Sequence, residues 1–294
     1  MTVCISAHCF KENTLVLASD SMVSTGDMSS ETLVKIRGLT RHWITHFAGN
    51  DVSVVELIFR EVKKNIALAG QETTEAIVNA FIQAIQSQLT SRAENEVLLP
   101  LGYTLQEFKA SGLAQLGSEN FSRLLFQIQQ QQLDVQFLIS GFDNGAAEIF
   151  TVSPPGRVSD YTNVGFWAIG SGQTNALGSL FNQQYAAKFT PLDHCIYRVC
   201  EAKFNSESAV GIGKGTNIAL LRPDGTRLTV PQKRIDELRE IWKKTRVTIP
   251  PQEGTDLIHQ FVEEAQKRAD EKTVRPQEQE PKQLAIPQQS ADQQ

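Results

Sequence analysis

The chain has 294 residues, 40% of them hydrophobic, and a formal net charge of -5. This length and composition allow a substantial core in one or two domains. The negative charge argues against a general nucleic-acid-binding surface, which would be basic. The first residues lack a basic segment and an apolar stretch of signal length, and no apolar run approaches the ~18 residues of a membrane span, so we expect a cytoplasmic protein with no membrane contact.

Cysteine usage indicates neither a disulfide framework nor a metal site. The four cysteines, Cys4, Cys9, Cys195 and Cys200, are few for a chain of this length and lack paired metal-type spacing. We therefore expect buried thiols, no metal and no organic cofactor.

The first half of the chain changes from strand to helix patterns near residue 50. Short β-rich runs predict strands over 2–9, 14–21, 32–36 and 42–49. Apolar residues at helical spacing (Val54, Val55, Ile58, Val62 and Ile66) predict an amphipathic helix that begins after Asp51. A second helix is predicted over 73–92, followed by a mostly helical insertion over about 93–132.

The second half returns to strands and then to helices. Strands over 135–142 and 147–152 are joined by Asp143, Asn144 and Gly145, whose types suit a hairpin turn. Further strands are predicted near Val158 and over 165–170, 216–223 and 226–230, with helices over 173–187 and 191–205. Blocks of strands and helices in this order favour an α+β fold, in which two sheets lie between two helix layers, over alternating βαβ units.

The predicted organisation is a main domain over 2–230, a helical extension over 231–270 and a disordered tail over 271–294. The extension contains a charged helix (232–246), a break at Pro250 and Pro251, and a further helix (253–271). The tail is rich in Gln, Pro and charge. The sequence leaves open whether the extension covers the core, a neighbouring subunit or a partner.

Thr2 has a chemical possibility that an internal threonine lacks. Removal of Met1 would place a free α-amine beside its hydroxyl, and an α-amine of pKa about 8 can accept the hydroxyl proton near neutral pH. One residue would then supply both nucleophile and base. Thr2 alone is also compatible with being no more than the first residue of a strand. Only residues elsewhere in the chain can distinguish a nucleophile from that alternative.

The downstream motifs carry a specific resemblance. They read LVLASDSMVSTGD from Leu15, then VKI, HFAG, FLISGFDNGAAEIFTVSPPG and FWAIGSGQTNALGSL. These runs resemble the proteasome β-subunit family of N-terminal nucleophile (Ntn) hydrolases, of bacterial or archaeal type, over about 2–66 and 134–230. The resemblance implies a four-layer αββα sandwich.

The resemblance also implies roles for individual residues. Lys35 would lie near Thr2 and lower the pKa of its α-amine, and Asp20 would keep Lys35 charged. Gly49 would offer its backbone N–H to the oxyanion of the tetrahedral intermediate, and Ser171 would bond the Thr2 amine.

One loop departs from the family pattern. The family carries an Asp and a Ser before its last hairpin, and the best alignment places Ser208 and Gly213 there. A slip of one or two residues would bring in Glu207 instead. We expect Ser208, at the position of the family's Asp, to be the catalytic residue on this loop. Because the usual Asp and Ser are missing, we expect fewer hydrogen bonds to the α-amine of Thr2.

For the substrate, the resemblance implies that Ser24 and Gly49 hold its backbone while Val23 and Phe47 line the pocket for the residue before the cut. Because those walls are apolar, we expect a modest preference for hydrophobic side chains.

Three functions remain open. The first is a threonine-type peptidase that assembles into a homo-oligomeric ring, cleaves peptides or unfolded proteins and could be fed by an unfoldase. The second is a non-peptide amidohydrolase on the same fold, with the insertion shaping its cleft. The third is an inactive structural or regulatory subunit, favoured only by the altered loop.

Overall fold

The computed structural model describes residues 2–25, 28–182, 185 and 188–245. The chain divides into two units, Met1–Lys244 and Thr245–Gln294. Everything described below belongs to the first unit, apart from the last residue of its final helix. The predicted helix over 253–271 and the tail lie outside the described residues.

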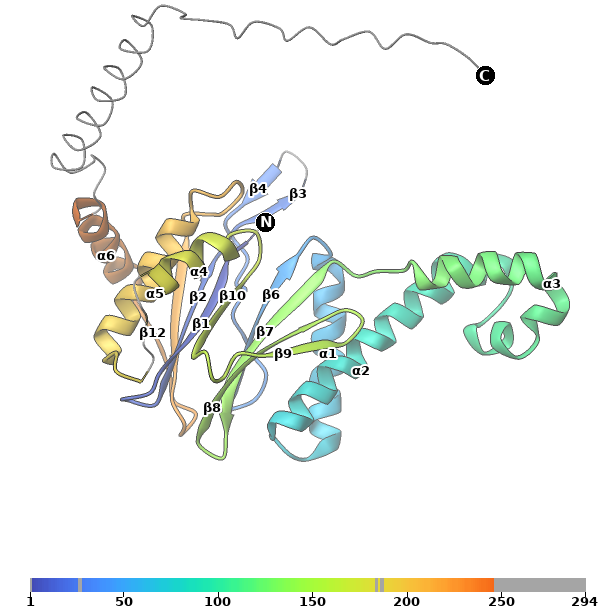
Figure 1. The fold of residues 1–294 in the computed structure, drawn as a ribbon, viewed down its shortest axis with the longest axis horizontal. Helices are drawn as coiled ribbons and strands as arrows, with labels where there is room; N and C mark the ends of the chain where they lie inside the picture. Colours follow the sequence, from blue (N-terminus) through green and yellow to red (C-terminus); the bar gives the residue numbers. More distant parts are fainter. Residues whose placement is uncertain (1, 26–27, 183–184, 186–187, 246–294) are drawn as a thin grey trace, which may run out of the picture. The chain divides into compact units, whose positions relative to one another are not determined.

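Two antiparallel five-stranded sheets form the centre (Figure 1). The first has the order β10-β1-β2-β11-β12, with bounds Phe166–Ile169, Cys4–Cys9, Thr14–Asp20, Thr216–Leu221 and Arg227–Thr229. The second has the order β5-β6-β7-β8-β9, with bounds Arg37–Gly38, Trp43–Gly49, Val135–Asp143, Ala146–Ser153 and Arg157–Asp160. A separate two-stranded ribbon joins β3 (Val23–Thr25) to β4 (Met28–Ser30).

Helices cover the outer face of each sheet. The helices α4 (Gln173–Asn182) and α5 (Leu192–Ser206) share a buried cluster with the first sheet, whereas α1 (Val52–Ala69) and α2 (Thr74–Ala93) share one with the second. A third cluster lies between the sheets. Strand alternation explains the layers: on β1, Ile5 points toward α4 and α5 while Cys4 points toward the other sheet. The predicted α+β sandwich of four layers is confirmed.

Local patterns predicted several elements correctly. All five apolar positions expected on α1 are buried. The β7–β8 hairpin turns where expected, with positive φ at Asn144 (49°) and Gly145 (83°).

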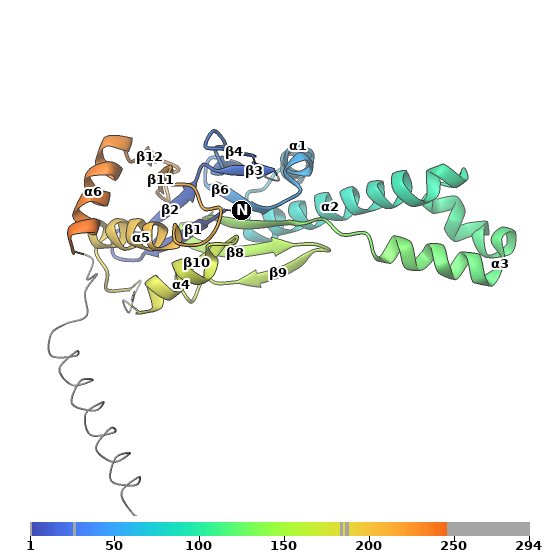
Figure 2. The same ribbon diagram turned by 90° about the horizontal axis from the view of Figure 1, so that it is seen from above.

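The segment 93–132 is mostly helical, as predicted. A π-helical turn (Glu94–Leu98) and a 3-10 turn (Leu99–Leu101) lead into α3 (Leu105–Gln129), which kinks at Gly117. Thr104 and Glu107 form a capping box that fixes the start of α3. Its small buried cluster is separate from the main core, and α3 lies beyond the end of α2, away from the sheets (Figures 1 and 2).

Two predicted elements differ in the structure. Residues 32–36 form no strand, and the first strand of the second sheet is β5. The segment 32–36 instead runs along the end of β2, where Leu33 N–H donates to the Ser21 carbonyl. The helix predicted over 173–187 is observed as α4 over Gln173–Asn182, and Tyr185 is not helical. Residues 183–184 and 186–187 lie outside the described residues. The first helix of the extension is α6 (Gln232–Thr245), and it packs on the core through Ile235 and Trp242.

Candidate active site

Thr2 lies just before β1 and is 4% exposed. The turn between β10 and α4 presses against it: Gly172 N–H donates to the Thr2 carbonyl at 3.1 Å. Gly170 has φ 93°, and a Cβ at that position would lie 2.6 Å from Thr2 Cγ2. Only glycine allows this approach, so the turn fixes Thr2 in place.

A buried ion pair meets the Thr2 hydroxyl. Thr2 Oγ1 donates to Asp20 Oδ1 at 2.5 Å, and Lys35 Nζ donates both to Thr2 Oγ1 and to Asp20 Oδ1, the latter at 2.8 Å. Lys35 is 3% exposed and Asp20 is fully buried. Water therefore screens this contact weakly, and the hydroxyl lies in a strong local field.

Backbone groups hold the Asp20 carboxylate. Val3 N–H donates to Oδ1 at 3.0 Å, while Met22 N–H and Gly213 N–H donate to Oδ2 at 3.1 and 3.4 Å. A buried ion pair is stable only when its remaining lone pairs are satisfied in this way. The carboxylate is thus fixed at the end of β2.

Ser171 lies on the other side of Thr2. The Thr2 nitrogen donates to Ser171 Oγ at 3.1 Å, and Ser171 Oγ donates to the Thr2 carbonyl at 3.4 Å. The nitrogen that would become the α-amine after removal of Met1 therefore already has a hydroxyl partner.

A pocket of about 270 Å³ opens at Thr2. Its walls come from the end of β6, the start of β7 and the β10–α4 turn, and its lining comprises Thr2, Ala48, Gly49, Asn50, Asp134, Gln136, Gly170 and Ser171. Gly49 has φ 135°, and its Cα lies so close to the Asp134 backbone that no side chain fits there. Thr2 and Gly49 therefore face one common pocket.

The structure brings Thr2, Asp20, Lys35 and Ser171 together, with Gly49 at the pocket wall, but it places Ser208 elsewhere. Ser208 is exposed after the end of α5, donates to the Asn205 carbonyl at 2.8 Å and accepts from Asn175 at 3.0 Å. No hydrogen bond within the described residues joins Ser208 to the Thr2 group. Gly213 meets Asp20, through its backbone rather than through a side chain.

The expected substrate pocket also differs. Phe47 is 3% exposed and packs against Phe59 in the cluster under α1, because strand alternation turns it to the helix side of β6. It does not line the pocket at Thr2, whose walls include polar side chains. Val23 and Ser24 pair with β4 through their backbones, and their side chains lie outside the described part.

Sequence reasoning missed a second charged group behind the site. Lys203 is fully buried, and its Nζ donates to Glu207 Oε1 at 2.5 Å and to the Gly213 carbonyl at 2.7 Å. Arg239 donates to both oxygens of Glu207. The spacing of Lys203 and Glu207, four residues apart on a helix, was the available signal, but such pairs are usually exposed.

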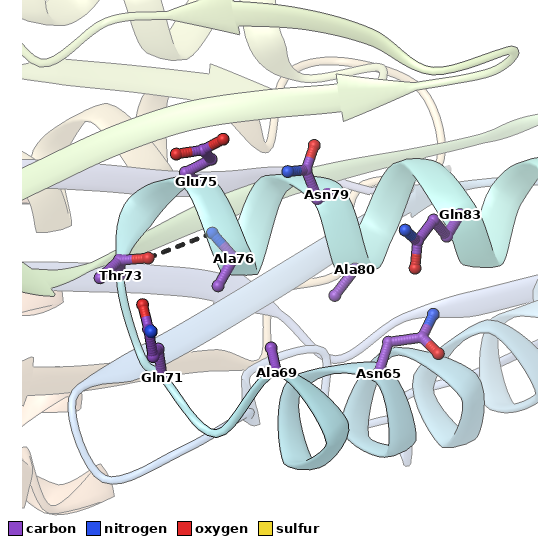
Figure 3. Close-up of a pocket in the computed structure, with 9 residues that line it drawn as sticks. All are labelled: Asn65, Ala69, Gln71, Thr73, Glu75, Ala76, Asn79, Ala80 and Gln83. Carbon is purple, nitrogen blue, oxygen red and sulfur yellow. Dashed lines mark hydrogen bonds between the residues drawn. The ribbon is translucent and has the colours of Figure 1, made fainter.

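Another pocket, of about 310 Å³, lies between α1 and α2 (Figure 3). Figure 3 shows Asn65, Asn79 and Gln83 around it, with Glu75 as its single acidic side chain and Thr73 capping α2. Its lining holds no buried ion pair beside a hydroxyl such as the Thr2 cluster has.

The four-layer fold defines the class as a proteasome-like Ntn hydrolase fold. Residues 84–202 match the family model described as Proteasome subunit, so the chain resembles that family. The match supports a resemblance to Ntn hydrolases at the family level. It includes the insertion over 93–132, which we expected to lie outside the resemblance, and it does not include the segment with Thr2, Asp20 and Lys35.

A search of curated proteins finds no match. Within the described ranges, no helix is long and apolar enough to cross a membrane.

Proposed function

We propose that the chain is a threonine-type Ntn peptidase in which Thr2 is the nucleophile after removal of Met1. The observation that carries this proposal is the convergence of Lys35 and Asp20 on the Thr2 hydroxyl, inside a buried site that opens into a pocket. Buried charges of this kind are expensive to maintain and are concentrated at functional sites.

The reaction follows from these positions. Thr2 Oγ1 attacks the substrate carbonyl carbon while its proton passes to the α-amine, giving a tetrahedral intermediate whose oxyanion faces Gly49. The intermediate collapses to an ester on Thr2, and the leaving amine takes the proton from the α-ammonium. Water then attacks the ester carbon and passes its proton to the α-amine. The bond from that carbon to Thr2 Oγ1 breaks, the proton returns from the α-ammonium to Oγ1, and the carboxylic acid product leaves. Lys35 supplies positive charge beside the developing alkoxide, and Ser171 holds the α-amine.

We further propose a homo-oligomeric assembly in the cytoplasm that cleaves peptides or unfolded proteins. The family match supports rings and peptide substrates, and the net charge of -5 argues against nucleic acid as a partner. The inactive-subunit alternative was favoured by the loop that lacks the usual Asp and Ser. That alternative loses weight because Gly213 N–H of this loop reaches Asp20.

The test is the intact mass of the purified full chain before and after incubation with a peptide epoxyketone, which reacts with the α-amine and hydroxyl of an N-terminal threonine together. We expect loss of Met1 and one adduct per chain. Thr2→Ala should abolish the adduct, whereas the control Thr2→Ser keeps a hydroxyl and should still react. A wild-type chain that retains Met1, or a free Thr2 that never reacts, would refute the proposal.

A further inference from the structure

The helix α6 follows the last strand of the sandwich and reaches back to the loop behind Asp20. Arg239, in the middle of α6, is 14% exposed and Glu207, just after α5, is 12% exposed. The guanidinium binds the carboxylate through two nitrogens, at 2.5 and 2.9 Å. Such a bidentate pair fixes orientation as well as distance, which a lysine cannot do.

Arg239 has further partners on the same loop. Its Nη2 donates to the Lys214 carbonyl at 2.7 Å and to Thr216 Oγ1 at 3.1 Å, and its guanidinium carbon lies 4.2 Å from the centre of the Phe204 ring. Thr216 is the register partner of Asp20 in the β2–β11 ladder. One side chain therefore contacts the loop directly after Gly213 and again where it enters the sheet.

Lys203 connects Glu207 to Gly213. Its ammonium group binds the Glu207 carboxylate and the Gly213 carbonyl, and Gly213 N–H bonds Asp20. Burial lowers the pKa of Lys203, and the negative charges of Glu207 and Asp20 act against that shift. The positive charge of Arg239 also lowers the pKa of Lys203. The Glu207 carboxylate favours the charged form of this lysine, and Arg239 holds that carboxylate through two hydrogen bonds.

Gly213 has little freedom to move on its own. A Cβ at Gly213 would lie 2.7 Å from the Met22 side chain, and Met22 N–H donates to the same oxygen of Asp20. Any displacement of the loop therefore changes the contacts of that carboxylate oxygen, while Oδ1 holds Thr2 and Lys35.

We propose that Arg239 is a positioning residue of the Thr2 site: through Glu207, Lys203 and the Lys214 carbonyl it fixes the loop that presents Gly213 N–H to Asp20. This inference rests on the proposed function. It also gives α6 a role, because a helix outside the sandwich completes the support of the nucleophile where the loop lacks the family's Asp and Ser.

The experiment measures inactivation of the full-length chain by a peptide epoxyketone, with the maximal rate, the half-saturating concentration and the final adducts per chain determined separately. We expect Arg239→Ala to lower the maximal rate roughly 10- to 100-fold, because small displacements of reacting groups have effects of that size. The half-saturating concentration should stay within about twofold and the final stoichiometry at one, because binding and the folded fraction are unaffected.

Matched variants make the result specific. Glu207→Gln preserves the shape of the side chain and should lower the maximal rate as Arg239→Ala does. Arg239→Lys keeps the positive charge but loses the bidentate guanidinium, so its maximal rate should lie between those of Arg239→Ala and wild type. Arg234→Ala is the control, because this arginine lies on the same helix in an exposed pair with Glu237. A role in folding alone would lower the final stoichiometry and leave the rate of the reacting chains unchanged.

An Arg239→Ala chain that reacts at the wild-type maximal rate, or that loses only stoichiometry, would overturn the inference. A wild-type chain that never reacts would instead refute the proposed function, and the inference with it. The two failures are distinguishable because the first requires a reactive wild type.

Discussion

The layer between the sheets holds a buried imidazole, and we expect acid to destabilise the fold through it. His46 lies on β6 and is 0% exposed, and neither ring nitrogen has a hydrogen-bond partner within the described residues. Burial lowers the pKa of His46 to about 3, against a smaller opposing effect of the backbone of Leu138, its register partner. In the unfolded chain the same group titrates near its ordinary value of about 6.5.

The sign and size follow from proton linkage. Between these two pKa values the unfolded chain binds a proton that the folded chain does not, so stability is fully present above about pH 6.5 and falls as the pH drops toward 3. The slope from this group is about 1.4 kcal/mol per pH unit, which gives about 2 kcal/mol between pH 8 and pH 5. Burial also lowers the pKa of His8, which adds an effect of the same sign.

The assay is urea unfolding at about pH 8 and about pH 5, with wild type, His46→Leu and the control His194→Asn, whose side chain is exposed on α5. Between pH 8 and pH 5 the free energy of unfolding should fall by about 2 kcal/mol less in His46→Leu than in wild type. At pH 8 it should be neutral or stabilising, because an unpaired polar group is replaced by an apolar one. Equal losses in wild type and His46→Leu would refute the reasoning.

Substitutions at Gly170 and Asp134 and the reactivity of the cysteines give three further tests. Gly170→Ala should slow epoxyketone labelling of Thr2 at least about tenfold, because the new Cβ would lie 2.6 Å from Thr2 Cγ2. The control Gly178→Ala places its Cβ in open space and should label at the wild-type rate. Equal rates in the two variants would contradict this prediction. Asp134 lines the pocket at Thr2, so cleavage of a fluorogenic peptide panel should show a preference for basic side chains. Asp134→Asn should remove that preference. A preference for apolar side chains in both wild type and variant would count against a role of the Asp134 charge. Burial raises the pKa of Cys4, Cys195 and Cys200 to about 12 and that of Cys9 to about 11, so iodoacetamide near neutral pH should label the unfolded chain only, as read by intact mass; rapid native labelling would exclude it.

Local sequence signals were sufficient for most elements because they act over a few residues. The spacing of apolar residues on α1 predicts which side of the helix is buried, and Asn144 and Gly145 adopt the positive φ that their turn requires. The same reasoning fails for 32–36, whose β-rich composition predicts a strand. Its backbone forms no ladder with any strand that the structure describes, and the Lys35 ammonium group binds Thr2 and Asp20.

The pocket could not be predicted in the same way, because β6 is buried on both faces. A half-buried strand reveals its inner side by alternation, but six of the seven residues of β6 are buried. The sequence therefore gives no sign that Phe47 packs against the helices. It also gives no sign that Asn50, Asp134 and Gln136 line the pocket at Thr2.

The support of Thr2 depends on contacts between distant parts of the chain. Thr2 and Ser171 are 169 residues apart, and Asp20 and Gly213 are 193 apart. A side-chain motif suggests such contacts only when the residue type is retained, and a backbone N–H can come from any residue except proline. The missing Asp and Ser therefore do not show that the site is unsupported. On this loop the Gly213 N–H donates to the Asp20 carboxylate, which binds the Thr2 hydroxyl, and Lys203 binds the Gly213 carbonyl. The loop therefore contributes through backbone groups, which no residue type in the sequence reveals.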